Sequence, residues 1–353
     1  HELTDNTNNQ KVKLTTINNC GSAALRIHFS AAPSLLHNED HTRPRKYPFV
    51  NMRLADHKML DTIEGRHSCR ICHRSRKFFC YSCYIPVGEL ENHLPRVELP
   101  VHIDIIKHKK EIDGKSTAVH AAVLAPAHVR IYTYPDIPDY REESGVVLIF
   151  PSSKSLTVAQ LFERNVQLKI EDNYGLPKGH HMGTMLRHRM DEVLHEENTA
   201  LSGRKYTYDN LPIRRAVFID STWNQSRGIY ADTRIRGLRT LVLQNRLSQF
   251  WRHQRGSPRW YLATIEAIHQ FLLEVHVNAW GLNRNYRGLD NLEITEGFHQ
   301  LAAPLSVSAE DLVDREAPYN GHYDNLLYFF ANMYDLIHKY YDHNELISYR
   351  RPI

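Results

Sequence analysis

The chain has few cysteines, no long apolar run and no marked excess of charge. Five cysteines among 353 residues are too few for a secreted protein held together by disulfides. No stretch approaches the ~18 uncharged apolar residues of a membrane span, and no signal-peptide pattern opens the chain. The formal charge of +4 permits a nucleic-acid partner without requiring one. With 42% hydrophobic residues, the composition is that of an ordinary globular protein with a sizeable core.

Four of the cysteines form two Cys-x-x-Cys pairs, Cys69–Cys72 and Cys80–Cys83, separated by a short basic segment. Each pair offers two thiolates, and two pairs complete the tetrahedral set that zinc prefers. A disulfide framework is the alternative, but the rest of the chain adds only Cys20. A redox role has no thioredoxin-like pattern around it. The spacing therefore predicts a structural zinc site.

The chain divides into three predicted parts. Residues 1–60 are polar and rich in Asn and His, and we expect a loosely ordered segment there. A zinc knuckle is predicted over residues 61–95 and an α/β domain over residues 96–345. The Arg43-Pro44-Arg45-Lys46 cluster predicts nuclear localisation, with the cytoplasm as an additional location. No pattern distinguishes a monomer from a homodimer.

The α/β domain is predicted from apolar runs that alternate with helical patterns. Strands are expected at Val101–Ile106, Val129–Tyr134, Gly145–Phe150, Ala216–Ile219 and Leu238–Leu243. Helices are expected at Val158–Phe162 and Met182–Glu196, and along two apolar stripes, Leu262–Val275 and Leu326–Tyr340, the first beginning near Ser257-Pro258. The fold class is therefore α/β with a mostly parallel sheet.

The most informative segment is Ala216 to Trp223, an apolar run that ends at Asp220-Ser221-Thr222-Trp223. An uninterrupted apolar run predicts a strand that is buried on both faces. Open α/β sheets bind their ligands beyond the carboxyl ends of such strands. The four residues are therefore candidate ligand contacts, although a helix cap and a core indole would explain Asp220 and Trp223 equally well.

Several blocks of the chain resemble the DTW-domain proteins, a family of tRNA-uridine aminocarboxypropyltransferases. The double Cys-x-x-Cys and the Asp220-Ser221-Thr222-Trp223 block carry the resemblance, together with Leu262–Ala267, where Ala263 replaces a frequent serine, and Tyr323–Phe330. The segments Ile105–His108, Gly114–His120 and Phe250–Gln254 also fit. Together these matches cover about residues 65–340.

The resemblance implies a SPOUT-like α/β fold with a C-terminal knot. It also implies S-adenosylmethionine as the co-substrate and transfer of its 3-amino-3-carboxypropyl group to N3 of a uridine in the tRNA D-loop. Such a transfer must bury the methyl group of the donor and present its Cγ to the nucleophile in line, so positioning dominates the selectivity. The expected donor-binding residues follow the strands or open the next helix: Phe150, Pro151, Ser152, Leu241, Leu243, Thr264 and Glu266.

Uridine N3 carries a proton at neutral pH, so a base must remove it or orient the nucleobase. Asp220 is the predicted base, Thr222 is expected to orient Asp220 or the donor, and Trp223 to pack against the ligand or fix the loop. A carboxylate beside the sulfonium would also stabilise its charge. Glu266 is a second acidic candidate, with a solvated glutamate on a helix face as the alternative.

The tRNA partner requires charge and stacking surfaces. Arginines crowd the region around the predicted active loop, with Trp251 and Trp260 among them: Arg214, Arg215, Arg227, Arg234, Arg236, Arg239, Arg246, Arg252, Arg255 and Arg259. The basic residues Arg70, Arg74, Arg76 and Lys77 of the knuckle offer a second contact. Two alternative functions remain open, a SPOUT-type RNA methyltransferase and a non-catalytic RNA-binding zinc protein.

Overall fold

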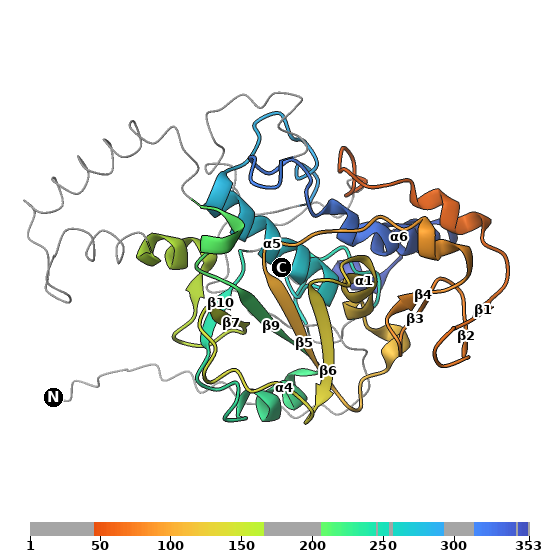
Figure 1. The fold of residues 1–353 in the computed structure, drawn as a ribbon. Coiled ribbons are helices and arrows are strands. Elements are labelled where there is room, and N and C mark those ends of the chain that lie inside the picture. The colour runs from red at the N-terminus through yellow and green to blue at the C-terminus, as the bar shows by residue number, and fades with distance from the viewer. Residues whose placement is uncertain are drawn as a thin grey trace, which may run out of the picture.

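The computed structural model describes residues 46–165, 206–244, 246–253, 257–292, 314–343 and 345–351, except for the side chains of Trp223 and Asn224. A six-stranded sheet forms its centre, in the order β6-β5-β9-β7-β10-β8, and every pair of neighbours is parallel (Figure 1). The prediction of a mostly parallel α/β sheet is confirmed. The strands are β5 His102–His108, β6 Val129–Tyr134, β7 Val146–Ile149, β8 Leu156–Thr157, β9 Arg215–Asp220 and β10 Arg239–Val242.

Strand β9 lies in the interior of the sheet, between β5 and β7. Its residues from Ala216 to Asp220 are at most 1% exposed, as expected for a parallel strand that is covered on both faces. Because all six strands run the same way, their carboxyl ends meet along one edge. The end of β9 therefore places Asp220 beside the ends of β5 and β7.

Four helices have complete bounds in the described structure: α1 Ala118–Leu124, α4 Trp223–Tyr230, α5 Thr264–Trp280 and α6 Tyr328–Tyr340. Residues 158–165 are also helical, as predicted. Helix α1 packs against α5, and the short 3-10 turn before α6 packs against both. Within the described ranges, six 3-10 turns complete the list: η1 His57–Thr62, η2 Gly88–Asn92, η3 Asp113–Lys115, η4 Tyr208–Asn210, η7 Asp324–Leu327 and η8 Ile347–Arg350.

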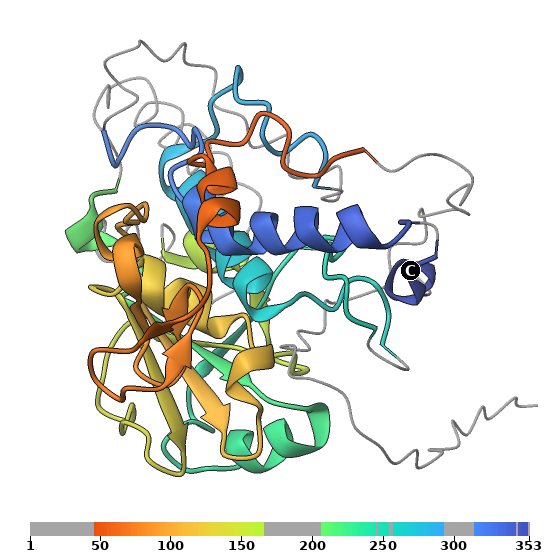
Figure 2. The same cartoon turned by 90° about the vertical axis from the view of Figure 1, so that its right-hand side faces the viewer.

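Helix α5 is buried on nearly all sides, because it lies between the sheet and the C-terminal elements (Figures 1 and 2). Its predicted start at Ser257-Pro258 is wrong. The chain makes a turn there, in which Tyr261 N donates to Pro258 O, and the helix begins at Thr264. The Glu266 carboxylate accepts the backbone N–H of Ala263 at 2.8 Å, which supplies the cap that fixes this later start.

The segment of residues 46–60 is packed, so the expectation of loose order is wrong for that part. Phe49 is 4% exposed, and η1 lies against α6 (Figure 2). Two backbone amides of the segment, those of Arg53 and Ala55, donate to Asp324 and Asn325 at 2.8 and 2.7 Å. The rest of the predicted lead-in, residues 1–45, and the predicted helix Met182–Glu196 lie outside the described residues.

The predicted zinc knuckle consists of two small antiparallel hairpins. The first pairs β1 His67–Ser68 with β2 Ser75–Arg76, and the second pairs β3 Phe79–Cys80 with β4 Ile85–Pro86. The three-part division of the chain and the C-terminal knot stay predictions. No helix in the described ranges is long and apolar enough to span a membrane.

Candidate active site and metal centre

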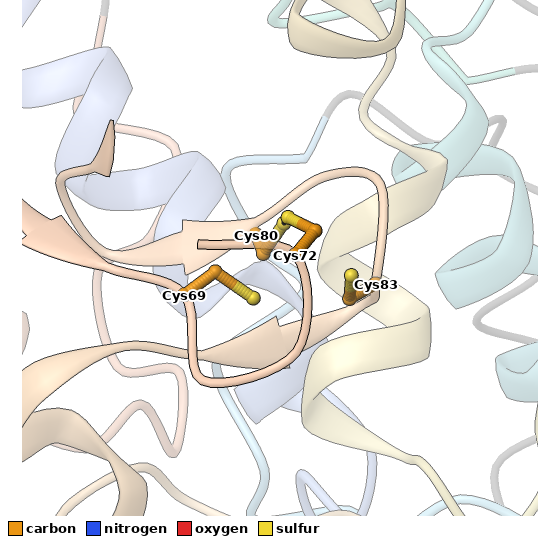
Figure 3. Close-up of side chains that lie close together, drawn as sticks. All are labelled: Cys69, Cys72, Cys80 and Cys83. Carbon is orange, nitrogen blue, oxygen red and sulfur yellow. The ribbon is translucent and has the colours of Figure 1, made fainter. Parts of the chain in front are cut away.

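The two hairpins of the knuckle bring all four predicted zinc ligands together (Figure 3). The sulfur atoms of Cys69, Cys72, Cys80 and Cys83 lie within 4.8 Å of one another, and those of Cys72 and Cys80 are 3.5 Å apart. Tetrahedral zinc with Zn–S bonds of ~2.3 Å requires sulfur atoms about 3.8 Å apart. The cluster therefore has the size and the donor set of a structural zinc site.

Each Cys-x-x-Cys pair folds in the same way. The residue after its second cysteine takes positive φ, 58° at both His73 and Tyr84, and its N–H donates to the carbonyl of the first cysteine. Although burial opposes ionisation of the Cys80 thiol, N–H groups at Ser82 and Cys83 lower its pKa to about 6. Burial and the neighbouring thiols raise the pKa of Cys83 to about 12. Bound zinc would stabilise all four as thiolates.

Asp220 is completely buried at the carboxyl end of β9. Ser116 Oγ donates to Asp220 Oδ2 at 2.6 Å, and Thr264 Oγ1 donates to Oδ1 at 2.8 Å. Burial raises the pKa of Asp220, while these two hydrogen bonds and the charge of Lys107 act in the opposite direction. The carboxyl group is thus more basic than an ordinary aspartate and is held by two hydroxyls from different elements.

The residues after Asp220 start the next helix. Thr222 is the N-cap of α4 and forms a capping box with Gln225, whose Oε1 accepts the Thr222 N–H at 3.0 Å. Trp223 is the first residue of α4, and its side chain lies outside the described part. Thr222, and not Asp220, is therefore the residue that caps the helix. The predicted contact between Thr222 and Asp220 is not among the hydrogen bonds found in the described ranges.

A cavity of about 190 Å³ adjoins Asp220 through Ser116. It lies between the knuckle, the segment before α1, the loop around Trp251 and helix α6. Its apolar walls are mostly aromatic: Phe78, Phe79, Tyr81, Phe250, Trp251, Phe329 and Met333. Basic residues contribute the charge around it: Arg66, Arg76, Lys77, Lys115 and Arg252. Flat aromatic walls with surrounding positive charge suit a nucleobase that is attached to a phosphate backbone.

Three polar side chains from the start of α1 line this cavity: Ser116, Thr117 and His120. His120 is 7% exposed, and its Nδ1 has no hydrogen-bond partner within the described part of the chain. Burial, helped by the charge of Arg252, lowers the pKa of His120 to about 3. The imidazole is therefore neutral at physiological pH and has an unused hydrogen-bonding nitrogen.

Comparison with known protein families matches residues 77–338 to the DTW domain. The chain belongs to the DTW-domain family. Among curated proteins it is similar to tRNA-uridine aminocarboxypropyltransferase 1 of Mus musculus and of Homo sapiens, each 38% identical over 82% of this chain and 84% of the relative. The protein of that name in Xenopus tropicalis is 34% identical over 81% of this chain and 85% of its own. No solved structure matches.

The DTW domain of this chain contains the whole six-stranded sheet and the cavity wall formed by α6. The predicted site residues Asp220, Thr222 and Trp223 lie inside the matched region, at the carboxyl edge of the sheet. The domain match begins at Lys77, between the two cysteine pairs. The first hairpin of the knuckle therefore precedes the matched region, although its Arg66 and Arg76 line the same cavity.

The residues predicted to bind the donor lie along the carboxyl edge of the DTW sheet, but most of their side chains are already engaged. Leu241 and Leu243 are core residues. Phe150 stacks on Tyr230 of α4 with ring centres 4.4 Å apart, and the Ser152 hydroxyl contacts Thr240 at 2.8 Å. None of the seven predicted residues lines the cavity beside Ser116.

Glu266 is completely buried, so the alternative of a solvated glutamate on a helix face is wrong. Its carboxylate accepts hydrogen bonds from Ser248 Oγ, Gln249 N and Ala263 N at 2.7, 2.7 and 2.8 Å. These bonds fasten the loop that carries Phe250 and Trp251 to the start of α5. Glu266 therefore fixes one wall of the cavity.

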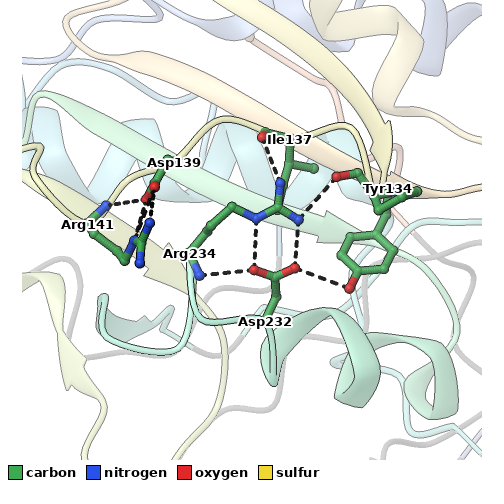
Figure 4. A network of polar contacts seen from close by, with 7 residues as sticks. Tyr134, Ile137, Asp139, Arg141, Asp232 and Arg234 are labelled. Carbon is green, nitrogen blue, oxygen red and sulfur yellow. Dashed lines mark hydrogen bonds and ion pairs between the residues drawn. The ribbon is translucent and has the colours of Figure 1, made fainter.

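The arginines of residues 214–259 do not form one surface, contrary to the prediction. Arg215 begins β9, where it pairs with buried Asp104 at 2.9 Å. Arg246 and Arg259 are each 1% exposed. Arg234 pairs with Asp232 and donates to the carbonyls of Pro135 and Ile137 (Figure 4). The reason is topological, because residues 214–259 include β9, α4, β10 and the segment before α5, which lie in different parts of the fold.

Of these predicted arginines, Arg252 lines the cavity, and Arg255 lies outside the described residues. In the knuckle, Arg70 pairs with Glu91 at 3.0 Å. Arg76 is 6% exposed, and its guanidinium stacks 3.8 Å from the centre of the Tyr81 ring. Lys77, Arg252 and Lys115 are therefore better candidates for phosphate contacts than the other arginines of residues 214–259.

Our sequence prediction missed Ser116, Thr117 and His120 as site residues. The segment Gly114–His120 resembled the family, which indicated that it could matter for function. It contains no chemical motif that would have assigned it a role. Ser116 is 104 positions from Asp220 in the sequence. The pairing of β5 with β9 and the packing of α1 against α5 bring these residues together.

Proposed function

We propose that this protein transfers the 3-amino-3-carboxypropyl group of S-adenosylmethionine to N3 of a uridine in the D-loop of tRNA. The names of its relatives support the transfer and the tRNA substrate. The observation that carries the proposal is the aromatic cavity beside the Ser116–Asp220 pair. The cavity can hold a nucleobase next to a carboxyl group whose pKa is raised by burial. Both lie at the edge of the sheet where α/β proteins bind their ligands.

The cavity would hold the target base. At about 190 Å³, it is smaller than the ~300–1,000 Å³ of pockets for drug-sized ligands. This size suits a single pyrimidine ring rather than the whole donor. A uridine that is turned out of an RNA loop would stack on the aromatic walls. Its flanking phosphates would meet Lys77, Lys115 and Arg252.

The donor would lie at the neighbouring ends of β7 and β10. Two side chains just after β10 keep buried polar atoms that no described residue satisfies, namely Gln244 Oε1 and the Nε and Nη2 atoms of Arg246. An amide oxygen suits an α-ammonium group, and a guanidinium suits an α-carboxylate. The apolar pair Phe150 and Tyr230 would border the methyl group. The sulfonium supplies an activated carbon, and the protein determines which carbon meets the nucleophile.

The zinc knuckle supports this function as the opposite wall of the base pocket. Arg76 of the first hairpin and Phe78, Phe79 and Tyr81 from the second half of the knuckle line the cavity. Zinc that fixes both hairpins would therefore keep this wall in place. Nuclear localisation of the protein remains our prediction.

The decisive test uses purified protein, an unmodified tRNA transcript and S-adenosylmethionine. Digestion and mass analysis should find a uridine that has gained the mass of an aminocarboxypropyl group, and fragment mapping should locate it in the D-loop. A gain of one methyl group would instead identify a methyltransferase. Specific tRNA binding without any adduct would favour a non-catalytic RNA-binding protein.

Asp220→Asn tests the predicted base. The substitution keeps the shape and one acceptor oxygen, replaces the other oxygen by an amide group that donates, and removes the group that takes a proton. We expect the rate of transfer to fall by a factor of about 10²–10⁴, with tRNA affinity within twofold of the wild type. Single-turnover rates and filter binding measure the two quantities. Near-normal turnover of this variant would remove Asp220 from the mechanism.

A further inference from the structure

Asp220 is separated from the cavity by one side chain. The carboxyl group has no exposed surface, and Asp220 is not among the residues that line the cavity. Ser116 lines the cavity and donates its hydroxyl hydrogen to Asp220 Oδ2 at 2.6 Å. A nucleobase in the cavity would therefore contact the Ser116 hydroxyl and not the Asp220 carboxylate behind it.

The hydrogen bonds of Ser116 leave it one free site. A hydroxyl has one hydrogen to donate and two lone pairs that accept. The hydrogen goes to Asp220, and one lone pair accepts the backbone N–H of Ala118 at 3.1 Å. The second lone pair is available to a donor in the cavity. The N3–H group of a uracil is such a donor.

The surroundings of Asp220 also suit a proton acceptor. Its second oxygen accepts a hydrogen bond from Thr264 Oγ1 at 2.8 Å, which fixes the orientation of the carboxyl group. Lys107 is the nearby positive charge, and it forms an ion pair with Asp113. Burial raises the pKa of Asp220 above that of a solvated aspartate, so the carboxylate takes up a proton more readily.

We propose that Ser116 is a catalytic residue that passes the N3 proton of the target uridine to Asp220. The inference rests on the proposed function. The N3 proton moves to Ser116 Oγ while the Ser116 hydrogen moves to Asp220 Oδ2. The electron pair left on N3 forms the bond to Cγ of the donor, the C–S bond breaks, and its electrons remain on sulfur as a neutral thioether. Ser116 Oγ stays neutral in this exchange, and the hydrogen bond from the Ala118 N–H holds it in position.

The test compares Ser116→Ala with the wild type on two tRNAs, one with uridine and one with 5-fluorouridine at the target position. The fluorine makes N3–H more acidic, so this substrate depends less on a base. With uridine, we expect Ser116→Ala to lower the single-turnover rate by a factor of about 10²–10⁴, with tRNA affinity within twofold. With 5-fluorouridine, most of the rate should return. Ser116→Thr keeps the hydroxyl and should lose less than tenfold.

Ser248→Ala is the matched control. It also removes a serine hydroxyl from a buried carboxylate, Glu266, but Ser248 does not line the cavity. Any loss that it causes should be equal on the two tRNAs. The proposal is overturned if wild-type protein forms the adduct and Ser116→Ala is equally fast, or is slowed to the same extent on both substrates. If wild-type protein forms no adduct on either tRNA, the proposed function itself fails.

Discussion

At the scale of the residue, His120 lowers the stability of the fold and also lines the cavity of the site. Its ring packs edge-on against Phe79, with ring centres 5.6 Å apart, and lies at the same distance from Phe329. Its Nδ1 is buried without a partner among the residues that the structure describes. Leaving such a group unsatisfied costs about 1–3 kcal/mol. A uracil edge in the cavity would supply the missing hydrogen bond.

We therefore predict opposite effects of His120→Phe on stability and on binding. The substitution keeps the aromatic packing and removes the unsatisfied nitrogen, so the free energy of unfolding should rise by about 1 kcal/mol. The KM for tRNA should rise about tenfold, the equivalent of one lost hydrogen bond of ~1.4 kcal/mol. Thermal denaturation and steady-state kinetics measure these effects. His120→Asn, which keeps a hydrogen-bonding group, should bind tRNA better than His120→Phe; equal tRNA binding by wild type and His120→Phe would refute the role.

The sequence allowed Asp220 to be found but not its neighbours. A carboxylate at the end of an apolar run is visible from local pattern alone, because burial and strand direction follow from the run. The bonds from Ser116 and Thr264 join positions far apart in the chain, so only the folded sheet reveals them. The full burial of Glu266 was missed for the same reason, since its three donors come from the loop before α5.

At the scale of the element, the zinc knuckle has its own small core. Cys69, Cys80 and Val87 form a buried cluster distinct from the main core. So small a cluster buries too little apolar surface to fold alone, and we expect metal binding to supply the missing free energy. The knuckle should therefore depend on zinc, while the sheet does not.

This dependence predicts the outcome of Cys72→Ser. The variant should lose its zinc, which wild-type protein should hold at one ion per chain by elemental analysis. Most far-UV circular dichroism should remain, because the sheet keeps its own core. Affinity for tRNA should fall about tenfold or more, since the knuckle wall of the cavity loses its support.

Ile71→Ser is the control for Cys72→Ser. Ile71 lies between the first two cysteines, is 57% exposed and offers no metal ligand, so zinc content and tRNA affinity should both match the wild type. Full tRNA affinity in zinc-free Cys72→Ser would contradict the role given to the knuckle.

Most elements of the sheet were predictable from apolar runs, and five of its six strands lie where the sequence placed them. The two-residue strand β8 and the short helix α1 were missed, because neither is long enough to show a period. Helix α5 was predicted to start too early. A proline is favourable in a first turn, but the Glu266 cap fixes the start at Thr264 instead.

At the scale of the whole molecule, residues 46–62 connect the start of the described chain to its C-terminal helix. Phe49 makes edge-on contacts with Phe330 and Tyr334 of α6, with ring centres 6.2 and 5.3 Å apart. His57 Nε2 lies 2.7 Å from Asp335 Oδ2. The sequence did not predict this packing, because the segment is short, polar and without a period. Its order comes from the surface of α6.

Helix α6 joins this distant packing to the site, because its Phe329, Asn332 and Met333 line the cavity. We expect Phe49→Ala to lower the free energy of unfolding by about 3 kcal/mol or more, since it removes a side chain that is 4% exposed. The vacated space should also let α6 shift and raise the KM for tRNA. Val50→Ala, at a neighbouring residue that is 40% exposed, should change neither quantity. Chemical denaturation and kinetics compare the two variants, and equal stability would show that residues 46–62 do not support the domain.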